Sequence, residues 1–216
     1  MTPIPLNDRP EIYYIVAAFL LAIGIFGLLR RRTLIGMLIS GELIFSGASL
    51  NLMGWVSRST SDVDIICAAR VDAKGKVKLQ PDKPLAPQFT ELVAEVGREL
   101  GIKQEWLNFG PAPLVEFGLP QGLERRLKRK SFGRCLALHL VSRLDQIHLK
   151  IYATMDPKTR LETHLGDLLD LEPTEAEAQA AVDWLLSRKT SLAFRRKLKQ
   201  VLDRIGHEKL AQKLQD

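Results

Sequence analysis

Hydrophobic residues are concentrated at the N-terminal end of the chain, where they form two long runs. The first covers residues 13–29, which read YYIVAAFLLAIGIFGLL without a charged side chain. At about 17 residues it is close to the length that a helix needs to cross a hydrocarbon core of about 30 Å, so it predicts a transmembrane helix. Arg30, Arg31 and Arg32 follow immediately, and the positive-inside rule places this end of the helix in the cytoplasm.

A second apolar run covers residues 34–56, and Glu42 is the only ionisable residue inside it. The run is long enough to return across a membrane, where a carboxylate usually marks an ion or proton path. The other interpretation is that only the first run crosses the membrane, and that Glu42 is an edge residue of a strand in a soluble domain. Both interpretations stay open at this point.

Two aspartates follow these runs at a spacing that is typical of a strand. Asp62 and Asp64 alternate with apolar residues, so both carboxylates lie on one face of the predicted strand. Neighbouring carboxylates repel each other unless a cation lies between them, and the pair therefore predicts a Mg²⁺ site. Upstream, Ser46 and Gly47 have the composition of a turn that presents backbone N–H groups to phosphate.

Turn signals predict the elements that come next. Residues 71–84 contain Gly75 among several lysines, which indicates a hairpin or an exposed loop. A helix is predicted over residues 86–100, and Gly101 is a suitable residue to end it. Trp106 is expected to pack against the core, and the Trp-Leu-Asn segment that it begins is expected to form a helix end and a turn.

Capping signals predict a helical C-terminal part. A strand over residues 135–141 is followed by Ser142 and Asp145, the pattern of a capping box for a helix over residues 142–155. Thr174 and Glu177 form a second capping-box pattern, and Ser191 is expected to cap a last helix. The predicted fold is α+β, with a membrane leader over residues 1–40, an α/β domain over residues 41–170 and a helical lobe over residues 171–216.

Composition and charge exclude several classes of protein. With 216 residues, 46% hydrophobic residues and two cysteines, the chain is neither disordered nor a disulfide scaffold. Cys67 and Cys135 are therefore interpreted as buried thiols in a reducing compartment. The net charge of +6 is divided between the arginines after the first apolar run and a basic segment at residues 121–134. That segment is interpreted as a solvated face or as a guide for a polynucleotide backbone.

The N-terminal part resembles a respiratory membrane subunit. Residues from about Tyr13 to Asn51, which include LLAIGIFGLLRRRTLIGMLISGELIFSGASLNL, are similar to the first two transmembrane helices of subunit K of the bacterial NADH-quinone oxidoreductase. In that family the second helix carries a glutamate used in proton translocation, and Glu42 lies in the matching place. The resemblance lacks the family's third span, because no apolar run of the required length of about 18 residues follows Val56.

The rest of the chain, from about Glu42 to Gly206, resembles the nucleotidyltransferase superfamily. The segment GASLNLMGWVSRSTSDVDI is similar to its opening, and later segments resemble an uncharacterised nucleotidyltransferase-like family related to abortive-infection toxins. The resemblance implies a mixed sheet with helices, Mg²⁺ as cofactor and a nucleoside triphosphate as substrate. It also implies RNA or protein as acceptor and a cognate antitoxin as partner.

The resemblance assigns roles to individual residues. Asp62 and Asp64 match the metal carboxylates, Lys150 matches a lysine directed at the nucleotide phosphates, and Asp167 matches an acid that follows this lysine. The third metal carboxylate is not evident, because the strand that should carry it offers only His139. Glu116 is the alternative acid. Five further residues are assigned to nucleotide binding: Ser46, Gly47, Ser49, Arg58 and Thr60.

Three functions are compatible with these patterns. The first is a nucleotidyltransferase that is tethered to the inner membrane through residues 13–29, with its soluble domain in the cytoplasm and an acceptor that is RNA or protein. The second is a fragment of a respiratory membrane subunit in which Glu42 is the functional group. The third is a binding module that keeps the nucleotidyltransferase fold and lacks catalysis.

Overall fold

The computed structural model describes residues 41–45, 47–56, 63–81, 87–103, 105–132, 136–157, 160–188 and 191–214. The predicted transmembrane run lies outside these residues, and so do Ser46, Arg58, Thr60, Asp62 and Cys135. The described residues form two compact units, which meet in the chain between Val141 and Ser142. We refer to them as the sheet unit and the helical unit.

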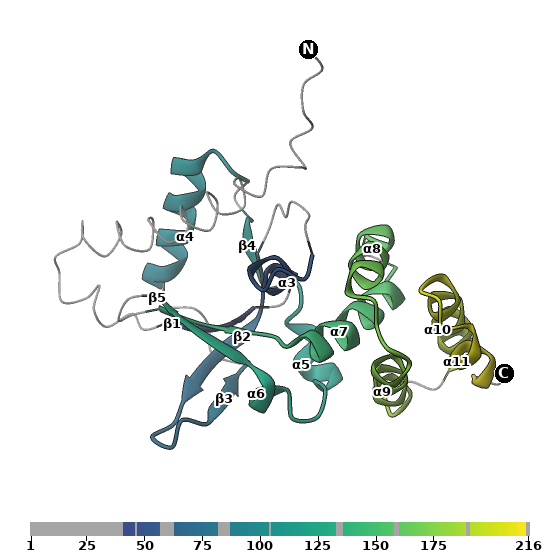
Figure 1. The fold of residues 1–216 in the computed structure, drawn as a ribbon. Helices are drawn as coiled ribbons and strands as arrows, with labels where there is room; N and C mark the ends of the chain where they lie inside the picture. Colours follow the sequence, from purple (N-terminus) through teal and green to yellow (C-terminus); the bar gives the residue numbers. More distant parts are fainter. Residues whose placement is uncertain are drawn as a thin grey trace, which may run out of the picture. The chain divides into compact units, whose positions relative to one another are not determined.

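The sheet unit is built on a mixed sheet (Figure 1). Strand β1 lies in the middle, antiparallel to β2 and parallel to β6, and the order is β3-β2-β1-β6-β5 with β4 paired in parallel to β2. The strands are β1 (Gly41–Phe45), β2 (Val63–Val71), β3 (Val77–Gln80), β4 (Leu107–Asn108), β5 (Lys128–Phe132) and β6 (Leu136–Leu140). The described helices of this unit are α3 (Gly47–Leu52), α4 (Pro87–Leu100), α5 (Pro113–Phe117) and α6 (Leu123–Arg126).

One face of this sheet carries an apolar core. Ile65 of β2 packs with Leu138 and Leu140 of β6, and Leu52 of α3 and Phe89 of α4 pack against this cluster. Side chains alternate between the two faces of a strand, so His139, between Leu138 and Leu140, faces the opposite side. The two faces are therefore chemically different, and α4 and α6 lie on opposite sides of the sheet (Figure 1).

Trp106 packs against α4, whereas Leu107 and Asn108 form strand β4 and not the helix end and turn that the sequence predicted. The Trp106 indole N–H donates a hydrogen bond to the backbone oxygen of Val93 over 3.0 Å. Gly97 makes room for the ring, because a Cβ at this position would lie 3.2 Å from the Trp106 Cδ1 atom. The helix ends at Gly101, which has a φ of +62°, a backbone conformation that glycine adopts at little cost. The helix predicted at residues 86–100 is thereby confirmed.

The predicted hairpin joins β2 to β3. The Oδ1 atom of Asp72 accepts hydrogen bonds from the backbone N–H groups of Lys74 and Lys76, each over 3.0 Å. The bond from Lys76 is the main reason why the pKa of this carboxyl is lowered. Gly75 occupies the turn with a φ of +76°, which glycine allows because it has no Cβ.

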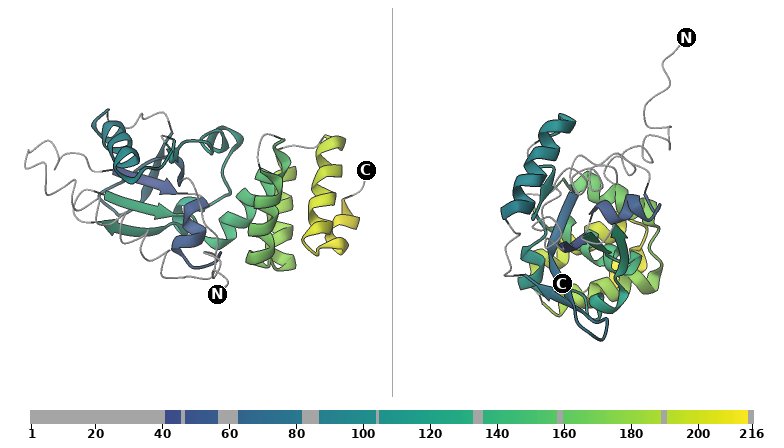
Figure 2. Two further views of the ribbon diagram at one scale, coloured as in Figure 1. Left: turned by 90° about the horizontal axis from the view of Figure 1, so that it is seen from above. Right: turned by 90° about the vertical axis from the view of Figure 1, so that its left-hand side faces the viewer.

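The helical unit begins earlier than the predicted lobe at residue 171. Its helices are α7 (Arg143–Met155), α8 (Leu161–Leu171), α9 (Glu175–Leu186), α10 (Leu192–Arg204) and α11 (Glu208–Lys213), and Figure 2 shows them side by side in green and yellow. Helix α7 packs against both α8 and α9, so these helices share one core. Ser142, Thr174 and Ser191 cap α7, α9 and α10 as the sequence predicted.

The second apolar run of the sequence contributes to the sheet. Within it, residues 41–45 form β1 and residues 47–52 form α3, which agrees with the interpretation that this run begins a strand-containing domain. In the part of the chain that the structure describes, no helix has the length and apolar character needed to cross a bilayer.

Candidate functional site

Asp64 lies at the edge of the sheet where β1 ends and α3 begins. The antiparallel register pairs Phe45 with Ile65, so the end of β1 lies beside the strand position of Asp64. Asp64 is half-buried, and because it neighbours Ile65 it faces the side of the sheet away from the apolar core, as His139 does. The register therefore brings Gly47 and Asp64 to the same end of two neighbouring strands. Their predicted companions Ser46 and Asp62 lie outside the described residues.

Asn108 joins Asp64 through strand β4. The parallel register pairs these two residues directly, and the Asn108 Oδ1 atom accepts a hydrogen bond from the Gly110 N–H over 2.7 Å. A Cβ on Gly110 would lie 2.9 Å from Asn108 Oδ1, so a larger residue at this position would have to displace the Asn108 side chain, whereas the 3.9 Å to Asp64 Oδ1 is an ordinary contact. Sequence reasoning missed Asn108, although an asparagine two residues before a glycine is a signal for such a local turn.

The oxygen atoms of Asp64 and Asn108 fit the chemistry of a hard divalent cation. Mg²⁺ prefers carboxylate and carbonyl oxygens and is usually held by one or two carboxylates together with substrate phosphates. Within the described ranges, no group of three or more histidine, cysteine, aspartate or glutamate side chains could hold a metal ion. Asp64 is the described member of the predicted carboxylate pair, and its predicted partner Asp62 lies outside the described residues.

Lys150 and Asp167 are brought together inside the helical unit. The Lys150 Nζ atom of α7 lies 2.6 Å from the Asp167 Oδ2 atom of α8, and their side chains are 7% and 0% exposed. A buried charge requires a partner, because removal from water costs several kcal/mol for each ion. The two residues that the resemblance assigned to one site thus form a buried ion pair.

Other predicted candidates lie in different settings. Ser49 of α3 is fully buried, which does not suit direct contact with a nucleotide. Glu116 is exposed on α5. His148 is buried, with Nδ1 2.7 Å from the backbone oxygen of Leu144 and its ring 5.6 Å from that of Trp184. These contacts hold the His148 ring inside the helical unit.

An arginine clamp connects three helices of the helical unit. Arg143, at the start of α7, is hydrogen-bonded to the Glu177 carboxylate of α9 and to the backbone oxygens of Leu171 and Glu172 at the end of α8. Partial burial acts to raise the pKa of Glu177, but hydrogen bonds from Arg143 and Thr174 outweigh it and lower the pKa. The clamp fixes the start of α7, on which Lys150 lies.

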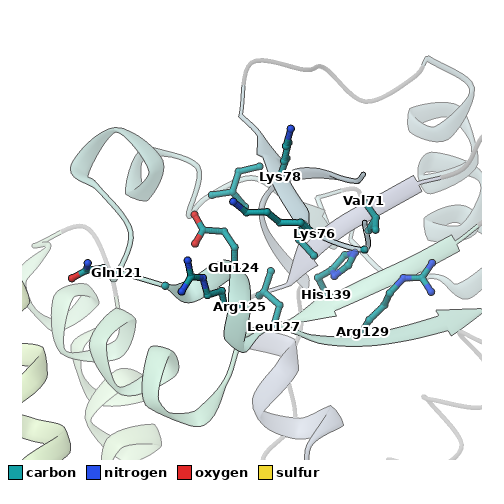
Figure 3. Close-up of a pocket in the computed structure, with 13 residues that line it drawn as sticks. Val71, Lys76, Lys78, Gln121, Glu124, Arg125, Leu127, Arg129 and His139 are labelled. Carbon is teal, nitrogen blue, oxygen red and sulfur yellow. The ribbon is translucent and has the colours of Figure 1, made fainter. Parts of the chain in front are cut away.

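A pocket of about 770 Å³ opens on the sheet unit (Figure 3). The β2–β3 hairpin contributes Lys76 and Lys78, α6 contributes Glu124 and Arg125, and β5 contributes Arg129. Figure 3 shows Lys76 extending toward Glu124 and Arg125. The remaining lining residues are Val71, Gly75, Val77, Leu79, Gln121, Gly122, Leu127 and His139.

Comparison with known proteins gives a match for the N-terminal part of the chain. Residues 12–96 match the family model described as NADH-ubiquinone/plastoquinone oxidoreductase chain 4L. NADH-quinone oxidoreductase subunit K 1 of Syntrophobacter fumaroxidans (strain DSM 10017 / MPOB) is 51% identical over 43 residues, which are 20% of this chain and 42% of that relative. The chain therefore spans about two fifths of the length of the curated relative that it matches.

No solved structure matches the chain. The nucleotidyltransferase resemblance stays a prediction, whereas the predicted similarity to subunit K is confirmed for the N-terminal part. Residues 12–96 thus match the NADH-quinone oxidoreductase subunit K family.

Proposed function

We propose that the chain is a two-part protein, in which a subunit K-like N-terminal segment attaches a nucleotidyltransferase to the inner membrane. The second part transfers a nucleotide from a nucleoside triphosphate to an acceptor on the cytoplasmic side. The observation that supports the enzymatic proposal is the register of β1 and β2, which pairs Phe45 with Ile65 and so puts the end of β1 beside the strand position of Asp64. A phosphate-binding turn and a metal carboxylate are needed at one place for this reaction.

The residues have separate tasks in this proposal. Asp62 and Asp64 hold Mg²⁺, Asn108 supports Asp64 from the neighbouring strand, and the turn at Ser46 and Gly47 holds the triphosphate. The cation supplies charge neutralisation on the phosphates and orients them for an in-line displacement.

Transfer of labelled nucleotide tests the enzymatic proposal. The full chain, purified in detergent, is incubated with radiolabelled nucleoside triphosphates, Mg²⁺ and total RNA, and in parallel with total protein. Label transfer should be lost in Asp64→Asn and kept in Asp170→Asn, which removes the same charge from an exposed position on α8. Transfer that survives Asp62→Asn combined with Asp64→Asn would show that another group carries the reaction.

The family match favours a second candidate, a membrane role within the respiratory NADH-quinone oxidoreductase. In it, Glu42 is the membrane carboxylate and the segment from about residue 34 to 56 is a second span. The backbone hydrogen bonds of β1 count against this candidate, because β1 is paired with β2 on one edge and β6 on the other. A membrane helix satisfies its backbone groups internally and leaves none for such pairing.

Membrane topology separates the two candidates. Single cysteines are introduced before residue 13 and after Ser57 in a chain without its native cysteines, and intact cells are treated with an impermeant maleimide. One span puts the two sites on opposite sides of the membrane, so only the first is labelled from outside. Labelling of both sites from the same side would favour the subunit K-like candidate with two spans.

A further inference from the structure

The pocket and Asp64 lie on the same face of the sheet. His139 of β6 lines the pocket, and it is paired with Arg129 of β5, so both face away from the apolar core, as Asp64 does. The pocket is formed wholly within the sheet unit, between the β2–β3 hairpin, α6 and the β5–β6 pair. A ligand held in it therefore lies on the catalytic face of the proposed enzyme.

The lining of the pocket has a strong excess of positive charge. Four cationic side chains, Lys76, Lys78, Arg125 and Arg129, face one carboxylate, Glu124. Asp72 offsets Lys78 only weakly, because the two groups are 3.9 Å apart and the lysine is 65% exposed. Cations gathered around one cavity repel each other and raise the local concentration of anions. The charge therefore points to an anionic ligand.

The remaining lining is apolar and favours a ligand with an apolar or aromatic part. Val71, Val77, Leu79 and Leu127 lie between the cationic groups. The volume of about 770 Å³ falls within the range of about 300–1,000 Å³ that is usual for ligand pockets. Phosphates with attached sugars and bases combine both properties, whereas an inorganic anion uses only the charge.

The basic surface extends beyond the pocket. Lys74, at the hairpin, is an exposed neighbour of lining residues. Lys128 and Lys130 are exposed on the edge strand β5, but on the face opposite the pocket, because they pair with Leu140 and Leu138. A mononucleotide would engage the pocket alone, while a strand with a phosphate at each nucleotide would also reach Lys74 and, where it passes around the edge strand β5, Lys128 and Lys130. The extended distribution of charge favours a polynucleotide over a free nucleotide.

We propose that this pocket binds a segment of single-stranded RNA, which is the acceptor of the nucleotidyl transfer. Lys76, Arg125 and Arg129 contact its phosphates, and the apolar floor receives a base. The assignment as acceptor rests on the proposed function, whereas RNA binding by the pocket does not. Of the cationic residues in the basic segment of the sequence, Arg125 and Arg129 line this pocket.

Fluorescence anisotropy with a fluorescein-labelled oligouridylate of about a dozen nucleotides tests the binding step, with the full chain in detergent and no nucleoside triphosphate. The pocket variant is Lys76→Gln with Arg125→Gln and Arg129→Gln. The control variant is Arg98→Gln with Lys199→Gln and Lys209→Gln, three exposed cations outside the pocket. Both variants have the same net charge, so a general effect of charge changes them equally.

We expect the pocket variant to bind the oligouridylate at least about tenfold more weakly. The slope of log Kd against log salt concentration should fall by about 2, because three phosphate contacts are removed and each contributes about 0.7 on a single strand. The control should stay within about threefold of the native chain. Equal binding by the two variants, with native circular dichroism for both, overturns the proposal. Displacement of the labelled strand by uridine monophosphate at the same nucleotide concentration also overturns it, because the pocket then holds a single nucleotide.

The two proposals fail separately. Asp64→Asn should keep RNA binding and lose label transfer. If the pocket variant loses RNA binding but the native chain transfers no label, the proposed function fails and the pocket assignment stands as an RNA site only. If label transfer depends on Asp64 but the pocket variant labels RNA at the native rate, the acceptor assignment fails alone.

Discussion

The buried ion pair between Lys150 and Asp167 provides the sharpest test of this structure. Replacing Lys150 with methionine keeps an unbranched side chain that is one atom shorter, but leaves the Asp167 carboxylate without its cationic partner in a fully buried position. Breaking such a pair by removing one member costs about 3–5 kcal/mol of folding free energy. Replacing both members with apolar residues of similar volume is often nearly neutral.

We therefore expect Lys150→Met to destabilise the helical unit by about 3–5 kcal/mol, and the double variant Lys150→Met with Asp167→Leu to stay within about 1 kcal/mol of the native chain. Urea unfolding of the full chain in detergent, followed by helical circular dichroism, measures both. With a slope of about 1–3 kcal/mol per molar urea, the single variant should lower the midpoint by at least about 1 M. A single variant that unfolds at the native midpoint would refute the buried pairing.

The same double variant separates a structural from a catalytic role for Lys150. If the pair only stabilises the helices, the double variant keeps both the fold and nucleotide transfer. If Lys150 also acts on the nucleotide phosphates, as the sequence predicted, the double variant folds like the native chain and transfers no label. Asp170→Asn, an exposed change on α8, is the control for both measurements.

Three further predictions follow from the contacts. Gly97→Ala should destabilise the chain by about 1 kcal/mol although alanine is the better helix former, because the new Cβ meets the Trp106 ring at 3.2 Å. In a chain that also carries Trp106→Leu, the same change should stabilise. If urea unfolding shows the same sign in both backgrounds, this packing is contradicted. Burial raises the pKa of Cys67 to about 11 from its ordinary value of 9.0, which lowers the thiolate fraction at neutral pH about 100-fold. In a chain with Cys135 changed to serine, the Cys67 thiol of the folded protein should therefore be alkylated about 100-fold more slowly than that of the protein unfolded in urea. Equal rates would contradict the burial of Cys67. The pKa of Glu177 is lowered in the folded chain, so its carboxylate contributes stability that is complete above the unfolded pKa of 4.5 and is lost as the pH falls below that value. Arg143→Met should therefore make the free energy of unfolding less dependent on pH in this acid range. An unchanged pH profile of unfolding would contradict the clamp.

Part of the candidate site could be predicted from the sequence. The alternation of acids with apolar residues identified Asp64 on a strand, and the pattern of Ser142 with Asp145 identified the helix that carries Lys150. Asn108 was missed because its role depends on pairing with a strand more than forty positions earlier in the chain. The basic pocket was anticipated only as a charged segment, since its other half comes from the β2–β3 hairpin.

Local chemistry explains what the sequence determined by itself. Caps at Ser142, Thr174 and Ser191, the turn at Asp72 and the helix end at Gly101 are set by hydrogen bonds between residues close in the chain. Such bonds form in the same way wherever the segment lies.

The tertiary structure decided the features that join distant segments. It placed β1 parallel to β6, nearly a hundred residues later, paired Asp64 with Asn108, and buried Lys150 against Asp167. Strand register and ion pairing between helices depend on which apolar faces pack together, and several arrangements of the same local elements bury similar faces. Only the folded chain selects one of them, and with it the face of the sheet on which the proposed site lies.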